Sequence, residues 1–111
     1  MLLENKGAVV TGGSRGIGRA VAEALAAEGA TVAVIYAGNT KAAEDTVRTI
    51  EEAGGKAFTV QCDVADEDAV ADMVKTVHEK LGTIDVFVNN AGITRDGLLM
   101  RMKREDWDAV L

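Results

Sequence analysis

The sequence contains a single cysteine, Cys62, among its 111 residues. One cysteine excludes a disulfide within the chain and any zinc site built from several cysteines. Because no disulfide calls for an oxidising compartment, we expect a cytoplasmic protein. Long apolar runs are also missing: each covers only a few residues, whereas a membrane-spanning helix needs roughly 20. We therefore expect a soluble chain with no membrane partner.

Positive charge is in short supply, with 12 Lys and Arg against 18 Asp and Glu and a net charge of −6. Nucleic-acid binding requires clustered basic side chains, so we expect no nucleic-acid partner. The first residues, Met1–Lys6, are short and mixed in character, so we expect no signal peptide. The apolar fraction of 48% argues against disorder, and the length suits one domain.

Short apolar segments alternate with amphipathic ones along the chain. The apolar segments predict four strands, over residues 7–11, 31–36, 57–62 and 84–89. Strands separated by helices form a parallel sheet with right-handed crossovers. The expected fold class is therefore α/β: a Rossmann-type parallel sheet of strand order 3-2-1-4 with helices on both faces, which is half of a doubly wound fold.

Apolar spacing and capping residues predict the helices. Thr40 and Asp66 are predicted to be the N-caps of the second and third helices. A further helix is expected over residues 98–111. The first helix is predicted to bury one face, whose members follow the spacing i, i+3, i+4, i+7 and i+8: Ile17, Ala20, Val21, Ala24 and Leu25.

A glycine-rich turn with the sequence TGGSRGIG, residues 11–18, joins the first strand to the first helix. A helix N-terminus offers unpaired N–H groups and a positive dipole end, and glycines allow the backbone to approach a pyrophosphate closely. Arg19 and Ala20 stand where a P-loop has its lysine and hydroxyl, and the G-x-G-x-x-G spacing is absent. A tight turn without a ligand is the alternative, but this position favours dinucleotide binding.

The segment after the second strand, residues 36–41, contains no acid. An NAD site places Asp or Glu about 20 residues beyond the glycines, on the ribose 2′-hydroxyl. Arg15 is instead expected to face a 2′-phosphate, with Asn39, Thr40 or Lys41 on the other side. Charge complementarity therefore favours NADP(H) as the cofactor. The alternative is that Arg15 and Lys41 are ordinary surface charges.

A third signal, Asn89-Asn90-Ala91-Gly92, follows the fourth strand. In the expected sheet, strands one and four are neighbours whose helices lie on opposite faces, and ligands bind in the crevice at such a switch point. The glycine-rich turn and this loop are predicted to open into the same crevice. For Asn89, local hydrogen bonds within a turn are the alternative.

Together, Thr11-Gly12-x-x-x-Gly16-x-Gly18 and the loop 89–92 resemble the short-chain dehydrogenase/reductase family. Within that family, segment 90–102 and Trp107 are similar to the bacterial 3-oxoacyl-[acyl-carrier-protein] reductases. The resemblance covers the whole chain. It implies hydride transfer from NADPH to a 3-oxoacyl thioester in fatty acid synthesis, with acyl carrier protein as a partner of the full-length enzyme only.

The resemblance also implies three groups of cofactor-binding residues, so that residues 1–111 form a partial, NADP-binding Rossmann-type domain. The pyrophosphate would lie against the turn, the adenine amino group near the acid after the third strand, and a ribose along the loop after the fourth strand. The implied residues are Gly12, Ser14, Arg15, Gly16, Ile17 and Gly18 in the turn, Asp63 with Val64, and Asn90, Ala91 and Gly92 in the loop.

The family's chemistry uses a Ser, a Tyr and a Lys, and these are missing here. Tyr36 is the one tyrosine, Ser14 the one serine, and Tyr36 is expected at the adenosine end. We therefore predict no catalytic residue and no metal site, an absent catalytic half, and a chain that is inactive alone. The alternative is a truncated or engineered nucleotide-binding module that self-associates, as a homo-oligomer, through the edge of the fourth strand or the helix over 98–111.

Overall fold

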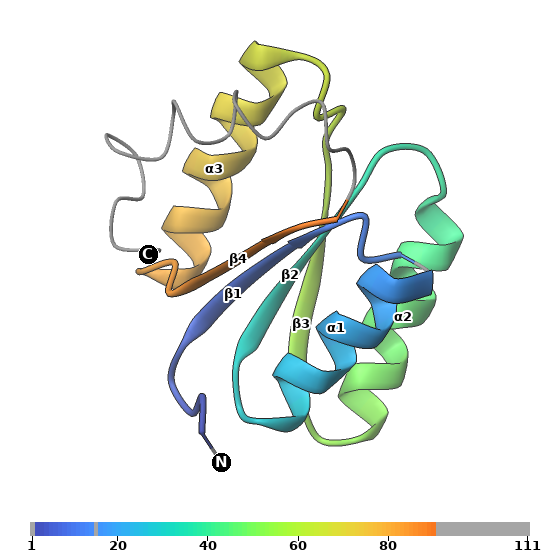
Figure 1. The fold of residues 1–111 in the computed structure, drawn as a ribbon, viewed down its shortest axis with the longest axis vertical. Helices are drawn as coiled ribbons and strands as arrows, with labels where there is room; N and C mark the ends of the chain where they lie inside the picture. Colours follow the sequence, from blue (N-terminus) through green and yellow to red (C-terminus); the bar gives the residue numbers. More distant parts are fainter. Residues whose placement is uncertain (1, 15, 91–111) are drawn as a thin grey trace.

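A computed structural model describes residues 2–14 and 16–90 of the chain. The predictions for Arg15, Ala91, Gly92 and the helix over 98–111 concern residues outside the described part. In the described part, strands and helices alternate (Figure 1) in the order β1 (Gly7–Thr11), α1 (Gly16–Ala27), β2 (Thr31–Tyr36), α2 (Thr40–Glu52), β3 (Lys56–Gln61), α3 (Glu67–Leu81) and β4 (Val86–Asn89).

The strands form one parallel sheet of order β3-β2-β1-β4, which confirms the predicted fold class. Helices α1 and α2 cover one face of the sheet and α3 covers the other (Figure 1). β1 and β4 are neighbours in the sheet, but α1, which follows β1, and α3, which precedes β4, lie on opposite faces. This is the switch point at which open parallel sheets bind ligands.

The two inner strands are apolar on both faces because both faces are covered. In β1, Val9 packs with the buried residues of α3, whereas Ala8 and Val10 pack with α1 and α2. The cluster on the α3 side, here called the α3 cluster, includes Val70, Met73, Val74 and Val77. The same alternation divides the side chains of β2, all of whose residues after Thr31 are buried. Continuous apolar strands of this kind are typical of parallel sheets covered on both sides.

The predicted buried face of α1 is wrong at three of its five residues. Ile17 is 74% exposed, and Ala20 and Ala24 are also exposed. The helix instead turns its smallest residues toward the sheet and buries Gly18, Ala22 and Ala26, with Val21 and Leu25 partly buried beside them. Small side chains allow the helix backbone to approach the strands closely, so close packing decided the orientation rather than hydrophobicity.

The predicted N-cap of α2 is shifted by one residue. Asn39 is the cap, since its Oδ1 accepts a hydrogen bond of 2.9 Å from the backbone N–H of Ala42. Thr40 is the first helical residue, and its hydroxyl donates to the Tyr36 hydroxyl at 3.3 Å. Asparagine satisfies a free amide of the first turn as well as threonine does. Asp66 caps α3 as predicted.

The fourth strand begins two residues later than predicted. Ile84 is 2% exposed, but it is buried in the α3 cluster and not in the ladder. Asp85 then joins the starts of two strands: its Oδ2 accepts from Gly7 N at 2.9 Å, and its own N–H donates to Gly7 O at 2.8 Å. Because Ile84 is apolar and buried, the apolar pattern predicted a strand that begins two residues before the sheet does.

β4 forms one edge of the sheet, where it pairs with β1, and its residues are half-buried. The prediction that this edge self-associates stays a prediction. In residues 2–14 and 16–90, no helix has the length and apolar character needed to span a membrane. Nor does this part of the chain gather three or more His, Cys, Asp or Glu side chains where they could hold a metal ion.

Candidate functional site

The carboxyl ends of the described strands open into one cavity of about 340 Å³. Each strand contributes to its lining through the residues at or just beyond its end. This is the end of a parallel sheet at which ligands bind. The lining residues are Gly12 and Ser14 after β1, Ile35–Asn39 at the end of β2, Cys62 and Val64 after β3, and Asn90 after β4.

Four of the predicted site residues, Gly12, Ser14, Val64 and Asn90, therefore line the same cavity. Asp63 is exposed and is not part of the lining; its Oδ1 accepts a hydrogen bond of 2.9 Å from Ala65 N.

Ile17 projects from the first turn of α1 with most of its surface exposed. Gly16 has a φ of +63°, a backbone conformation that favours glycine. A Cβ at Gly16 would meet nothing within 4 Å, so backbone conformation alone accounts for this glycine.

Gly18 lies at the point where the turn, the helix and the β4 loop meet. A Cβ on Gly18 would overlap the carbonyl oxygen of Gly12 and lie 2.8 Å from Nδ2 of Asn90. The start of the turn is held separately, because Gly12 N–H donates to Ile35 O at 2.9 Å. The glycine-rich turn, the start of α1 and the loop after β4 are thus in close contact at Gly18, and its missing side chain is what allows it.

Thr11 ties the end of β1 to the end of β4. Its side chain is fully buried, and Oγ1 donates to Asn89 Oδ1 at 2.9 Å while it accepts from Asn90 N–H, also at 2.9 Å. Asn89 therefore bonds across the sheet and not only within its own turn. The two loops that flank the switch point are held in a fixed relation by this one hydroxyl.

Thr46 of α2 contacts the site, and sequence reasoning missed it. Its fully buried hydroxyl lies 3.0 Å from Ser14 O in the glycine-rich turn and 3.1 Å from Ala42 O in its own helix, so these two carbonyls share its one proton. For this helix, only the N-cap is predicted from the sequence. Thr46 lies three residues after Ala43 and four before Ile50, both buried, and this helical spacing was the signal that could have found it.

Hydrogen bonds from residues at the end of β3 hold the segment that follows β2. The backbone N–H of Cys62 donates to Tyr36 O at 2.8 Å, and Nε2 of Gln61 donates to Ala37 O at 2.9 Å. Tyr36 itself is 9% exposed and lines the cavity. The acid-free segment predicted to face a 2′-phosphate is therefore anchored beside the glycine-rich turn.

The Cys62 thiol is buried against the cavity, and burial raises its pKa from an ordinary value of 9.0 to about 11, with Asp63 and Asp66 adding to the rise. The neutral thiol is therefore the form of the folded protein at neutral pH. Because the thiol has a higher pKa in the folded chain than in the unfolded chain, its contribution to folding stability is fully present below pH 9. That contribution is lost as the pH rises toward 11.

We expect the labelling rate of Cys62 by a thiol reagent to follow this pKa. In the folded chain the rate should rise about tenfold for each pH unit beyond pH 9, because only the thiolate reacts. In denaturant, the labelling rate of the same thiol should level off near pH 9. A folded-state rate that levels off below pH 9 would contradict the buried position.

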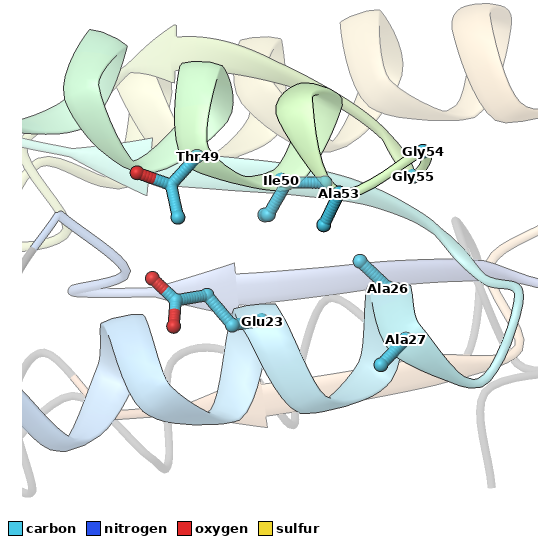
Figure 2. A pocket seen from close by; sticks show the side chains of 8 residues that line it. All are labelled: Glu23, Ala26, Ala27, Thr49, Ile50, Ala53, Gly54 and Gly55. Atoms are coloured by element: carbon cyan, nitrogen blue, oxygen red, sulfur yellow. The ribbon is translucent and has the colours of Figure 1, made fainter.

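A second cavity, of about 250 Å³, lies between α1 and α2 (Figure 2). It lies at the carboxyl ends of these helices, and therefore at the opposite end of the sheet from the glycine-rich turn. Its one carboxylate, Glu23, accepts a hydrogen bond of 2.7 Å from Arg19 Nε. The lining is otherwise mostly small and apolar: Ala26, Ala27, Thr49, Ile50, Ala53, Gly54 and Gly55.

Comparison with known proteins finds relatives that match nearly the whole chain. Residues 6–111 match the family model described as short chain dehydrogenase. The chain is 53% identical over 107 residues to the 3-oxoacyl-[acyl-carrier-protein] reductase FabG of Staphylococcus epidermidis, covering 96% of the chain and 44% of that protein. It is 56% identical over 104 residues to the 3-oxoacyl-[acyl-carrier-protein] reductase of Synechocystis, covering 94% and 42%. The chain thus spans less than half the length of these relatives.

Solved structures agree with the sheet topology. A short chain dehydrogenase from Burkholderia cenocepacia, solved in complex with NADP, is 48% identical with a TM-score of 0.79, over 84% of this chain and 38% of that one. A dehydrogenase/reductase from Sinorhizobium meliloti is 34% identical with a TM-score of 0.89, over 95% of this chain and 50% of that one.

Proposed function

Since the chain belongs to the short-chain dehydrogenase family, we propose that it is the NADP(H)-binding portion of an oxidoreductase similar to the 3-oxoacyl-[acyl-carrier-protein] reductases. The observation that carries the proposal is the convergence of Gly12, Ser14 and Asn90 on one cavity at the carboxyl ends of the strands. The reaction proposed for the whole enzyme is hydride transfer from NADPH to a 3-oxoacyl thioester in fatty acid synthesis. The relatives' names, 3-oxoacyl-[acyl-carrier-protein] reductase, support the reduction of a 3-oxoacyl group.

The residues of the cavity fit a dinucleotide. α1 begins at Gly16, within the glycine-rich turn, so the free amides and positive dipole end of its first helical turn suit a diphosphate. Gly18 keeps this end of the helix against Gly12, where any Cβ would force the backbone apart. The lining includes several small residues, Gly12, Ser14, Ala37 and Gly38, which leave room for the ligand.

When bound, NADPH supplies the hydride for carbonyl reduction. The residues of this chain bind and orient the cofactor. Thr11 holds the two flanking loops together, and the segment Tyr36–Asn39 forms the wall on the β2 side. The bonds from β3 to this segment fix that wall in place.

The choice of NADPH over NADH is tested by the variant Arg15→Ala. The wild-type chain should bind NADPH more tightly than NADH, because residues 36–41 place no carboxylate against a 2′-phosphate. The variant should lose about tenfold or more in NADPH affinity, the size of one charge-assisted hydrogen bond, with little change for NADH. Both affinities are measured by fluorescence titration.

The matched control for this variant is Arg48→Ala. Arg48 lies on α2 with a largely exposed side chain paired to Asp45, so its removal changes the net charge equally without touching the cavity. It should leave both affinities within about twofold, as expected for exposed ion pairs. Equal losses for NADPH and NADH in Arg15→Ala would refute the assignment of Arg15 to the 2′-phosphate.

A further inference from the structure

Among the described residues, the fully buried polar side chains are Thr11 and Thr46. A buried hydroxyl is unfavourable unless it is hydrogen-bonded, so the position of its partner indicates its role. Thr11 joins the two loops at the switch point. Thr46 comes from outside those loops, on α2, and its partner Ser14 lies in the glycine-rich turn, 32 residues earlier in the sequence.

Among the described residues, the bond to Ser14 holds the middle of the turn, whereas the other contacts hold its two ends. Gly12 and Gly13 both donate to Ile35 O, which fixes the start of the turn. Gly18 packs against Gly12 and fixes its far end. Between these two points, the carbonyl of Ser14 is held by Thr46 at 3.0 Å.

We propose that Thr46 is a positioning residue of the dinucleotide site, which holds Ser14 so that the glycine-rich turn is ordered before the phosphates bind. This inference rests on the proposed function. A turn with several glycines has many accessible conformations, and ordering it upon binding weakens affinity. A bond that orders the turn in the free protein removes that cost from binding.

The packing of α1 against α2 provides the setting for this bond and also a control. Arg19 of α1 donates from Nη2 to Thr49 Oγ1 at 2.9 Å and pairs with Asp45 at 3.5 Å. Thr49 lies three residues beyond Thr46 on the same helix. It therefore joins α1 to α2 through its hydroxyl, as Thr46 joins the turn to α2, but it lines the remote cavity of Figure 2 and not the candidate site.

The experiment compares four variants, Thr46→Val, Thr46→Ala, Thr46→Ser and Thr49→Val, by titration with NADPH and NADH. Thr46→Val and Thr46→Ala should each lose about tenfold in affinity for both nucleotides, because the turn is shared by both and about one hydrogen bond is lost. Thr46→Ser should bind like the wild type, as should Thr49→Val. Urea unfolding of each variant shows whether the fold is retained.

The comparison of Thr46→Ser with Thr46→Ala decides the matter even if valine disturbs packing, since these two side chains differ by one oxygen atom. Equal affinities for this pair would overturn the role of Thr46. A loss in Thr49→Val as large as that in Thr46→Val would also overturn it, because it would show a general effect of the helix pair. Failure of the wild-type chain to bind either nucleotide would instead refute the proposed function.

Discussion

Replacing Gly18 with alanine will raise the dissociation constant for NADPH at least about a hundredfold, equivalent to about 2.7 kcal/mol. The added methyl group would overlap the carbonyl oxygen of Gly12 and lie 2.8 Å from Nδ2 of Asn90. The contacts with Gly12 are to its carbonyl oxygen and carbon, main-chain atoms that have no rotamer by which to move away. α1 must therefore shift from the turn, and the turn and the Asn90 loop both lose their positions at the cavity.

The same substitution should lower the free energy of unfolding by about 1–3 kcal/mol, the usual range for overpacking. A domain of ordinary stability, about 5–15 kcal/mol, stays folded after such a loss. Binding and folding are thus separable: urea unfolding should show a modest decrease, while isothermal titration shows nearly complete loss of NADPH binding.

Gly38→Ala is the matched control for folding. Gly38 follows β2, its φ lies outside the left-handed region, and a Cβ there would meet nothing within 4 Å. Its free energy of unfolding should change by less than about 0.5 kcal/mol, as for most surface substitutions. If Gly18→Ala bound NADPH within threefold of the wild type, the close contact between α1 and the turn would have no role in the site.

The second large effect is the absence of turnover. The 111-residue polypeptide should bind NADPH but should not oxidise it in the presence of an acetoacetyl thioester. Reduction of a ketone by hydride requires a group that protonates the developing alkoxide, which contributes about 10²–10⁴-fold to the rate. Tyr36, the one tyrosine, accepts a hydrogen bond from Thr40 beside the N-terminus of α2, and the one histidine, His78, is exposed on α3.

The assay follows NADPH absorbance with and without the thioester, and a full-length reductase of the family serves as the positive control. Adding a polypeptide that supplies the remaining part of such a reductase should restore activity if the two parts assemble. Steady oxidation of NADPH by the 111 residues alone, dependent on the thioester, would refute our assignment of this chain to cofactor binding only.

Much of the fold could be predicted from sequence because its determinants are local. Continuous apolar segments bounded by turns predicted the strands, and Asp66 predicted the start of α3. The errors arose where the determinant was tertiary. Ile17 is exposed because its neighbour Gly18 is the residue of α1 that packs against Gly12, and Ile84 is buried without joining a strand.

The candidate site divides in the same way. The glycine-rich turn could be located from sequence, since its spacing and its place between strand and helix are local properties. The bond from Thr46 to Ser14 spans 32 residues, and the bond from Thr11 to Asn89 spans 78. Nothing in the local pattern of either residue specifies its partner, so the contacts that hold the site together became visible only in the folded chain.

The central claim is that the cavity at the carboxyl ends of the strands binds NADPH, and amide chemical-shift mapping during a titration tests it most directly. We predict large shifts for the residues that line this cavity, among them Gly12, Ser14, Gly38 and Asn90. The amide signals of Gly54 and Gly55, which line the cavity between α1 and α2, should not shift. Shifts confined to Gly54 and Gly55, or no shifts at millimolar NADPH, would contradict the account.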